Sequence, residues 1–220
     1  MNRVRIKFCG ITRAEDALSA CALGVDAIGL VLTRRSRRCV EPALAREIRR
    51  TLPPFVAAVA LFMDDEPGFI ADAVAAVQPD LLQFHGSETL EECLRYEVPY
   101  IKAIAMDDGE RASAEPRVPR DLERELHEHS AAVGFAFDAH APGAPGGSGR
   151  AFDWSRIPPS LPRPLILAGG LTCDNVGSAI RAVHPYAVDV SSGIESAPGI
   201  KDAEKMRHFF EEVQRACSGK

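Results

Sequence analysis

The sequence has no long hydrophobic stretch and no excess of positive charge. No apolar run approaches the roughly 18 residues that a membrane helix needs, and the first seven residues form no apolar signal-peptide core. Its 26 basic and 31 acidic side chains give a net charge of −5, which favours neither nucleic acid nor an anionic membrane surface as a partner. We therefore expect a cytoplasmic protein that binds neither nucleic acid nor membranes.

Motifs for disulfides, dinucleotides and metals are also missing. None of the six cysteines forms a C-x-x-C pair with another, so in a chain of this size we expect reduced thiols. The turn Cys9–Thr12 after the first expected strand is not the G-x-G-x-x-G turn that binds dinucleotides. His127 and His129 stand two apart on an expected helix and so share no face, which argues against a metal pair.

What the sequence does contain is an alternation of short apolar strands with amphipathic helices. Its 220 residues, 46% of them hydrophobic, suffice for the core of one α/β domain, so we expect a single domain over residues 1–220. The expected strands are Ile6–Cys9, Ala27–Leu32, Phe55–Phe62, Leu81–Phe84, Tyr100–Ala105, Val133–Asp138, Leu165–Ala168 and Ala187–Val190. The expected helices are Arg13–Leu23, Pro42–Thr51, Pro67–Val77, Glu88–Tyr96, Asp121–Ser130, Asp174–Val183 and Asp202–Arg215. Eight strands in this alternation predict a (β/α)8 TIM barrel over the rival, a doubly wound open sheet.

The turn that ends the first strand carries a cysteine. The strand leads into Cys9 and Gly10, and Thr12–Glu15 then has the pattern of a capping box that opens a helix. Barrel enzymes bind their ligands at the carboxyl ends of the strands. Cys9 is therefore either presented to a substrate there or, as free cysteines often are, simply buried in the core.

Glycine and small polar residues follow each of the last two strands. Gly169 and Gly170 come after the seventh strand, and Ser191, Ser192 and Gly193 come after the eighth. Glycine lets backbone N–H groups approach phosphate oxygens closely, and barrels frequently bind phosphate with these two loops. A plain tight turn would explain either group alone, but the two together predict a phosphate site.

Four more polar residues stand near strand ends. Asp138 closes the sixth strand, where it either caps the next turn or acts as an acid that apolar surroundings keep partly protonated. Gln83 and His85 stand at the end of the fourth strand, in a structural or a catalytic role. Arg38 ends a basic run after the second strand that is either a solvated loop or a cationic clamp for an anionic group.

A set of short segments is jointly specific in order and spacing. These segments are Lys7–Thr12, Gln83–Gly86, Gly146–Gly149 with Phe152–Trp154, Leu167–Leu171, Val188–Glu195 and Pro198–Asp202. In them the chain resembles the phosphoribosylanthranilate isomerase family of tryptophan biosynthesis over essentially its whole length. The resemblance implies a (β/α)8 barrel and an Amadori rearrangement that needs no cofactor and no metal. The implied substrate is N-(5-phosphoribosyl)anthranilate, and the implied product is 1-(2-carboxyphenylamino)-1-deoxyribulose 5-phosphate. A monomer and a homodimer are both compatible with the sequence.

The resemblance also implies roles for individual residues. Asp138 is the general acid that protonates the furanose ring oxygen, and Cys9 is the general base that removes the C2 proton. Near neutral pH these roles would require a raised pKa for Asp138 and a lowered pKa for Cys9. The implied phosphate-holding residues are Gly169, Gly170, Ser191, Ser192 and Gly193. The implied substrate-binding residues are Arg38 and Asp189 on the anthranilate side, with Gln83 and His85 lining the site.

One loop departs from the family pattern, and two other functions stay open. The family usually has Ser-Pro-Arg and an aromatic residue after strand two, whereas Ser36–Cys39 keeps the serine and the arginine but lacks the proline and the aromatic residue, so Arg37 competes with Arg38. The first alternative is the histidine-pathway aminoaldose isomerase, whose family uses two aspartates where this chain has Cys9 and Asp138. The second is a phosphoribosyl-binding protein without catalysis, against which the presence of both residues argues.

Overall fold

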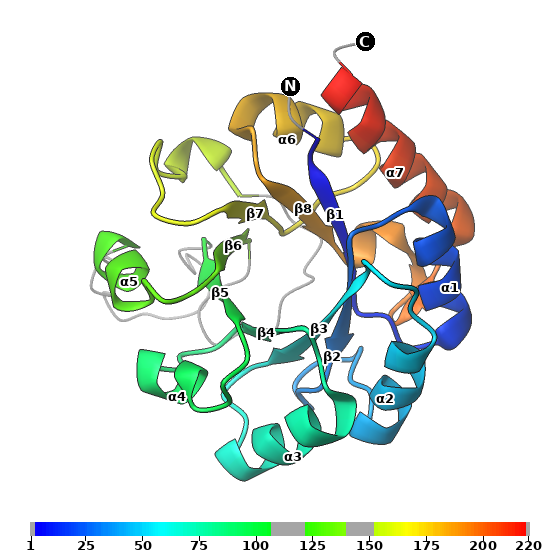
Figure 1. Cartoon of the computed structure of the whole chain (residues 1–220). Helices are drawn as coiled ribbons and strands as arrows, with labels where there is room; N and C mark the ends of the chain where they lie inside the picture. The colour runs from blue at the N-terminus through cyan, green and yellow to red at the C-terminus, as the bar shows by residue number, and fades with distance from the viewer. Residues whose placement is uncertain (1–2, 107–121, 140–151, 219–220) are drawn as a thin grey trace, which may run out of the picture.

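Eight parallel strands close into a barrel in the computed structural model, which describes residues 3–106, 122–139 and 152–218. The strands follow one another in sequence order, and β1 pairs with β8 to close the barrel (Figure 1). They are β1 (Arg5–Cys9), β2 (Ala27–Val31), β3 (Ala57–Phe62), β4 (Leu81–Phe84), β5 (Tyr100–Ala105), β6 (Gly134–Asp138), β7 (Leu165–Leu167) and β8 (Ala187–Val190). The predicted (β/α)8 barrel is confirmed.

Helices surround the barrel on the outside (Figure 1). They are α1 (Ala14–Leu23), α2 (Pro42–Arg50), α3 (Pro67–Val77), α4 (Leu90–Leu94), α5 (Leu122–Glu128), α6 (Val176–Val183) and α7 (Ala203–Ser218). Two short 3-10 helices, η1 (Trp154–Arg156) and η2 (Ser192–Ile194), and an antiparallel hairpin of β9 (Glu195–Ala197) and β10 (Ile200–Lys201) complete the described elements. No helix among the described residues is long and apolar enough to span a membrane.

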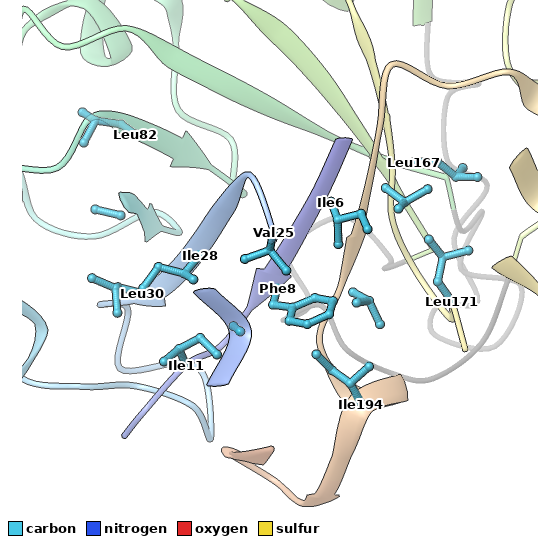
Figure 2. Close-up of a cluster of buried hydrophobic side chains, with 14 of the residues drawn as sticks. Ile6, Phe8, Ile11, Val25, Ile28, Leu30, Leu82, Leu167, Leu171 and Ile194 are labelled. Atoms are coloured by element: carbon cyan, nitrogen blue, oxygen red, sulfur yellow. The ribbon is translucent and has the colours of Figure 1, made fainter. Parts of the chain in front are cut away.

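Side chains alternate between the two faces of the barrel wall, as the strand period requires. On β1, Ile6 and Phe8 face outward into the main hydrophobic core between strands and helices (Figure 2). The ring of Phe8 packs edge-on against Phe209 of α7, with centroids 6.0 Å apart. Lys7 and Cys9 face the interior instead, where Lys7 reaches a residue of β8. This alternation places polar residues of an apolar strand inside the barrel.

The amino-terminal half of the barrel interior is filled by a small apolar cluster. Ile101 and Ala103 of β5, Ala136 of β6, Ile166 of β7 and Ala187 of β8 pack together there. A separate trio, formed by Cys9, Val31 and Leu61, lies toward the carboxyl ends of the first three strands. Because the lower interior is packed, the space for a ligand inside the described part of the barrel lies at the carboxyl ends of the strands.

The predicted elements differ from the structure at their ends. The third strand begins at Ala57 and not at Phe55, because Phe55 is fully exposed with φ +72° and so cannot continue a strand. The capping box predicted at Thr12 is wrong, since the N-cap of α1 is Arg13 and Thr12 donates its hydroxyl proton to the carbonyl of Gly199. The fourth helix, expected from Glu88, begins at Leu90 instead, after Thr89 caps it with a complete capping box. Residues 107–121, with the predicted helix start Asp121, and residues 140–151, with the segment Gly146–Gly149, lie outside the described residues.

Removal of the Phe209 ring will test the packing between α7 and β1. Phe209 is completely buried against Phe8, so we expect Phe209→Ala to lower the free energy of unfolding by about 3–5 kcal/mol. Urea denaturation followed by circular dichroism measures this change. The control is Leu18→Ala on α1, where half of the side chain is exposed, and there the loss stays below about 1 kcal/mol. Equal losses in the two variants would contradict this assignment of the core.

Candidate active site

A cleft opens at the carboxyl ends of the strands. Its volume, counted to the open mouth, is about 670 Å³, which is within the range of small-molecule sites. The cleft brings together nearly all the residues that the sequence singled out, namely Cys9, Arg38, Gln83, His85, Asp138, Gly169, Gly170, Asp189, Ser191 and Ser192. These residues come from the carboxyl ends of six strands, β1, β2, β4, β6, β7 and β8, and the loops that follow them.

Gly193 is the predicted site residue that does not line the cleft. A Cβ atom on this residue would lie 2.0 Å from the carbonyl oxygen of Leu171. The absent side chain therefore allows the turn after β8 to pack directly on the loop after β7. Gly193 thus determines how closely the two predicted phosphate loops pack against each other.

Cys9 owes its position to a glycine on the neighbouring strand. Gly29 of β2 lies beside it in the ladder, and a Cβ on Gly29 would approach the Cys9 sulfur to 2.6 Å. Since real Cβ atoms do not come so close, any larger residue at position 29 would push the thiol aside. The thiol points into the cleft, although most of the residue is buried.

A buried ion pair lies just below the thiol. Lys7 donates a hydrogen bond from Nζ to Oδ2 of Asp189 over 2.6 Å, and both side chains are almost completely buried. The two residues are directly opposed in the ladder between β1 and β8. Burial is the largest single effect and would lower the pKa of Lys7, but the charge of Asp189, the neighbouring Cys9 and the hydrogen bonds to both residues together outweigh it and raise the pKa. Lys7 is therefore a fixed positive charge.

The pKa of Cys9 moves in the direction opposite to the sequence-based expectation. Burial raises the pKa of the thiol above its ordinary value of 9.0, and the nearby Asp189 raises it further. The charges of Lys7 and Lys201 and a hydrogen bond from Lys7 act in the other direction without reversing the net effect. Without a ligand, the thiol therefore stays protonated near neutral pH, because the interior solvates a thiolate less well than water does.

Asp138 ends β6, and a histidine faces it. His85 Nε2 lies 3.6 Å from Oδ2 of Asp138, and on its other side His85 Nδ1 lies 3.4 Å from Nε2 of Gln83. Gly169 keeps this corner open, because a Cβ there would come within 2.9 Å of Asp138 Oδ1 and collide with the backbone of Ala139. Gln83, His85 and Asp138 thus form one row along the cleft, from β4 to β6.

Two buried acceptors in the cleft have no hydrogen-bond partner within the described part of the chain. They are Oε1 of Gln83 and Oδ1 of Asp189. A buried acceptor without a donor is costly, and native structures seldom leave one in place unless a ligand or water satisfies it. Both atoms belong to residues that line the cleft.

The loops after β7 and β8 present free backbone donors. Gly169 and Gly170 adopt φ of +77° and +64°, which L-residues with side chains rarely adopt. Within the described residues, the N–H groups of Gly169, Gly170 and Ser192 donate to no protein acceptor. Asn175 fixes the first loop by donating from Nδ2 to the carbonyl of Gly170, just before α6 begins. Free N–H groups at a helix start are the usual components of an anion site.

The basic run after β2 places one arginine at the cleft. Arg38 lines it, whereas Arg37 is exposed and outside it. Arg38 donates from Nε and Nη2 to the two carboxylate oxygens of Glu195, each over 2.7 Å. This ion pair occupies one edge of the guanidinium, so that a second anion would meet the Nη1 side.

Comparison with known proteins gives a consistent result along the whole chain. The model of the family N-(5'phosphoribosyl)anthranilate (PRA) isomerase matches residues 6–212. The chain belongs to this family. It is 50% identical over 214 residues to the N-(5'-phosphoribosyl)anthranilate isomerase of Stenotrophomonas maltophilia R551-3, covering 97% of this chain and 94% of the relative. The Pseudomonas aeruginosa isomerase (strain PAO1) is 49% identical over 214 residues, with 97% of both chains covered.

Solved structures of PRA isomerases have the same fold as this chain. The enzyme from Thermotoga maritima superposes with a TM-score of 0.82 at 40% identity, covering 96% of this chain and 98% of the other. A PRA isomerase in complex with reduced 1-(o-carboxyphenylamino)-1-deoxyribulose 5-phosphate superposes with a TM-score of 0.78 at 38% identity and with the same coverage. The family and the enzyme class predicted from the sequence are confirmed.

Sequence reasoning missed two residues of this PRA isomerase site, and one of them was detectable. Lys7 stands two positions before Cys9 on the same strand, and the period of two places both on one face. Lys201, in the segment Pro198–Asp202, donates to the carbonyl of Ser191 below the predicted phosphate turn. No local pattern identifies that contact. Within the described residues no three His, Cys, Asp or Glu side chains gather as a metal site would require.

The pH dependence of Cys9 alkylation will test its electrostatic setting. The thiolate is the reactive form, and burial raises the pKa of Cys9. We therefore expect the rate of alkylation by iodoacetamide to rise steadily between about pH 7 and about pH 10, whereas the rate for a short unstructured peptide with one cysteine levels off earlier. Mass spectrometry of the peptide that contains Cys9 gives the rate. A rate for Cys9 that levels off before that of the cysteine peptide would contradict the raised pKa.

Proposed function

We propose that this chain catalyses the Amadori rearrangement of N-(5'-phosphoribosyl)anthranilate in tryptophan biosynthesis, with Asp138 as acid and Cys9 as base. The observation that carries the proposal is the single cleft that holds a thiol on β1 and a carboxyl group on β6, beside two loops with free backbone donors. An acid and a base that act on different atoms of one sugar must come from different parts of the cleft wall. The closed strand order separates β1 from β6 by two strands.

The first step opens the furanose ring. Asp138 donates its proton to the ring oxygen, the bond between C1 and that oxygen breaks, and the lone pair of the anthranilate nitrogen forms a C1–N double bond. The product of this step is a protonated Schiff base with a free C4 hydroxyl group. His85, 3.6 Å from the carboxyl group, lies where it can interact with the carboxylate that remains.

The second step moves the double bond. Cys9, as the thiolate, takes the proton from C2, and the electron pair of that C–H bond forms a C1–C2 double bond while the C1–N electrons return to nitrogen. The resulting enol-amine becomes the ketone when C1 gains a proton and the hydroxyl group on C2 loses its proton. Lys7 is well placed for this step, because its fixed charge lies below the sulfur and stabilises the thiolate. This offsets part of the desolvation that raises the pKa of Cys9 in the empty cleft.

The two ends of the substrate fit the two ends of the cleft. The N–H groups of Gly169, Gly170 and Ser192, with Ser191 beside them, suit the 5'-phosphate group. Arg38 suits the anthranilate carboxylate through the guanidinium edge that Glu195 leaves free. The free acceptor Oδ1 of Asp189 suits the anthranilate N–H group.

The same proposal covers cofactors and cellular location. Substrate and product are isomers, so the rearrangement has no net oxidation or reduction, and the protonation of the ring oxygen and the removal of the C2 proton are assigned to side chains. We keep the prediction that no cofactor or metal takes part. We also keep the prediction of a cytoplasmic protein, which is supported by six cysteines that are all free.

Two substitutions will test the acid and the base. Cys9→Ala and Asp138→Asn should each lower kcat by at least about 100-fold, which is the usual contribution of a positioned acid or base. The assay generates the substrate from anthranilate and phosphoribosyl pyrophosphate with a transferase, and follows the loss of substrate fluorescence above spontaneous hydrolysis.

Matched controls lie far from the cleft. Cys21→Ala on α1 and Asp72→Asn on α3 remove the same groups outside the cleft and should leave kcat unchanged. Turnover near the parental rate in Cys9→Ala or Asp138→Asn would remove that residue from its role. A parental protein with no activity above spontaneous hydrolysis would leave a phosphoribosyl-binding barrel without chemistry.

A negative charge in the phosphate site gives a third test. Ser192→Asp should raise KM for the phosphorylated substrate by about tenfold or more, because the added carboxylate repels the phosphate. The effect on kcat should be smaller. Ser160→Asp places the same charge on an exposed loop before β7 and should leave KM unchanged. An unchanged KM in Ser192→Asp would place the phosphate site elsewhere.

A further inference from the structure

A buried carboxylate outside the cleft joins the two binding ends of the site. Glu195, the first residue of β9, does not line the cleft. Its carboxylate accepts both hydrogen bonds from Arg38, a third from Nζ of Lys201 over 2.8 Å, and a longer one from the N–H group of Gly199. These partners come from the loop after β2 and from the hairpin of β9 and β10.

The contacts on Arg38 fix the direction of its side chain. The aliphatic part of Arg38 crosses Gly10, where a Cβ would lie only 2.5 Å from Arg38 Cδ. Beyond Gly10 the guanidinium meets Glu195 in a two-point contact, which fixes its plane as well as its distance. Arg38 therefore approaches the cleft in a single orientation, although the loop that carries it lacks the proline of the family pattern.

The contacts on Lys201 reach the phosphate end. Its side chain is completely buried, and Nζ donates to the carbonyl oxygen of Ser191 over 3.1 Å as well as to Glu195. Ser191 leads directly into η2, the turn that carries Ser192. The carboxylate thus holds the ammonium group that supports this turn.

The charges of the cluster also favour an anionic ligand. Arg38 and Lys201 carry two positive charges against the single negative charge of Glu195, so the cluster has a net charge of +1. Hydrogen bonds from Arg38 and the charge of Lys201 outweigh burial and lower the pKa of Glu195, which therefore stays ionised. Without this carboxylate, two buried cations would face each other and the Arg38 side chain would lose its anchor.

We propose that Glu195 is a positioning residue for substrate binding, which orients Arg38 toward the anthranilate end and holds Lys201 under the phosphate turn. This proposal rests on the proposed function, because it takes the substrate to be anionic at both ends. A purely structural role in the β9–β10 hairpin is the competing explanation. The two differ in whether the effect of Glu195 on binding passes through Arg38.

A double-mutant cycle separates these explanations. The probe is reduced 1-(o-carboxyphenylamino)-1-deoxyribulose 5-phosphate, which binds a solved relative, and calorimetry gives its Kd. Glu195→Gln should raise Kd by about tenfold or more, as the loss of hydrogen bonds to charged groups implies. In an Arg38→Met background the same change should have a clearly smaller effect, because the guanidinium it orients is absent.

The controls make each result decisive. Glu211→Gln, which breaks an exposed pair with Arg207 on α7, should leave Kd unchanged. Glu195→Asp keeps a charge between the two cations, so it serves if Glu195→Gln does not fold, and its shorter side chain should still weaken binding. A folded Glu195 variant that binds the probe with the Kd of the parental protein would overturn the proposal. An equal effect of the Glu195 substitution on Kd with and without Arg38 would also overturn it. Failure of the parental protein to turn over phosphoribosylanthranilate would instead overturn the proposed function, whatever the binding cycle gives.

Discussion

The site depends on the seam where the first and last strands of the barrel meet. Closing the barrel puts β1 beside β8, and in that register Lys7 and Asp189 are directly opposed inside the barrel. Each would be very costly to bury alone, and together they form a tight ion pair below the Cys9 thiol. The chemistry proposed for Cys9 therefore requires the closed barrel, because only closure brings the Asp189 carboxylate opposite Lys7 and so holds the positive charge below the sulfur.

Glycines, which have no side chain, are as important for the geometry of this cleft as the charged residues are. Gly29 makes room for the sulfur of Cys9, and Gly10 lets Arg38 cross the first turn. Gly193 allows the turns after β7 and β8 to touch. Each of these glycines is explained by a close approach between two segments that are distant in sequence. A substitution at any of them would displace a functional group without removing it.

Much of the fold was predictable because the local pattern and the tertiary structure agree. All eight strands were located, since each is a short apolar run between clear turn residues. The errors lie where distant contacts decide, as at Thr12, whose hydroxyl bonds to Gly199 instead of capping α1. The cleft was also predictable, because strand ends meet at one rim. The pairings within it were not, since Lys7 and Asp189 stand 182 residues apart, and Arg38 and Glu195 stand 157 apart. The pKa direction of Cys9 follows from burial, which the sequence does not give.

The position of the β9–β10 hairpin in the chain also sets the order in which the site is completed during synthesis. The proposed acid and base and the first phosphate loop all precede residue 190, so a growing chain contains them before it contains the hairpin. Glu195 and Lys201 are made afterwards, followed by α7, whose Phe209 covers the outside of β1. A nascent chain that ends after β8 can therefore hold every proposed catalytic group while Arg38 still has no anchor. The binding end of the site is therefore completed after the catalytic groups, just before α7 covers the outside of β1.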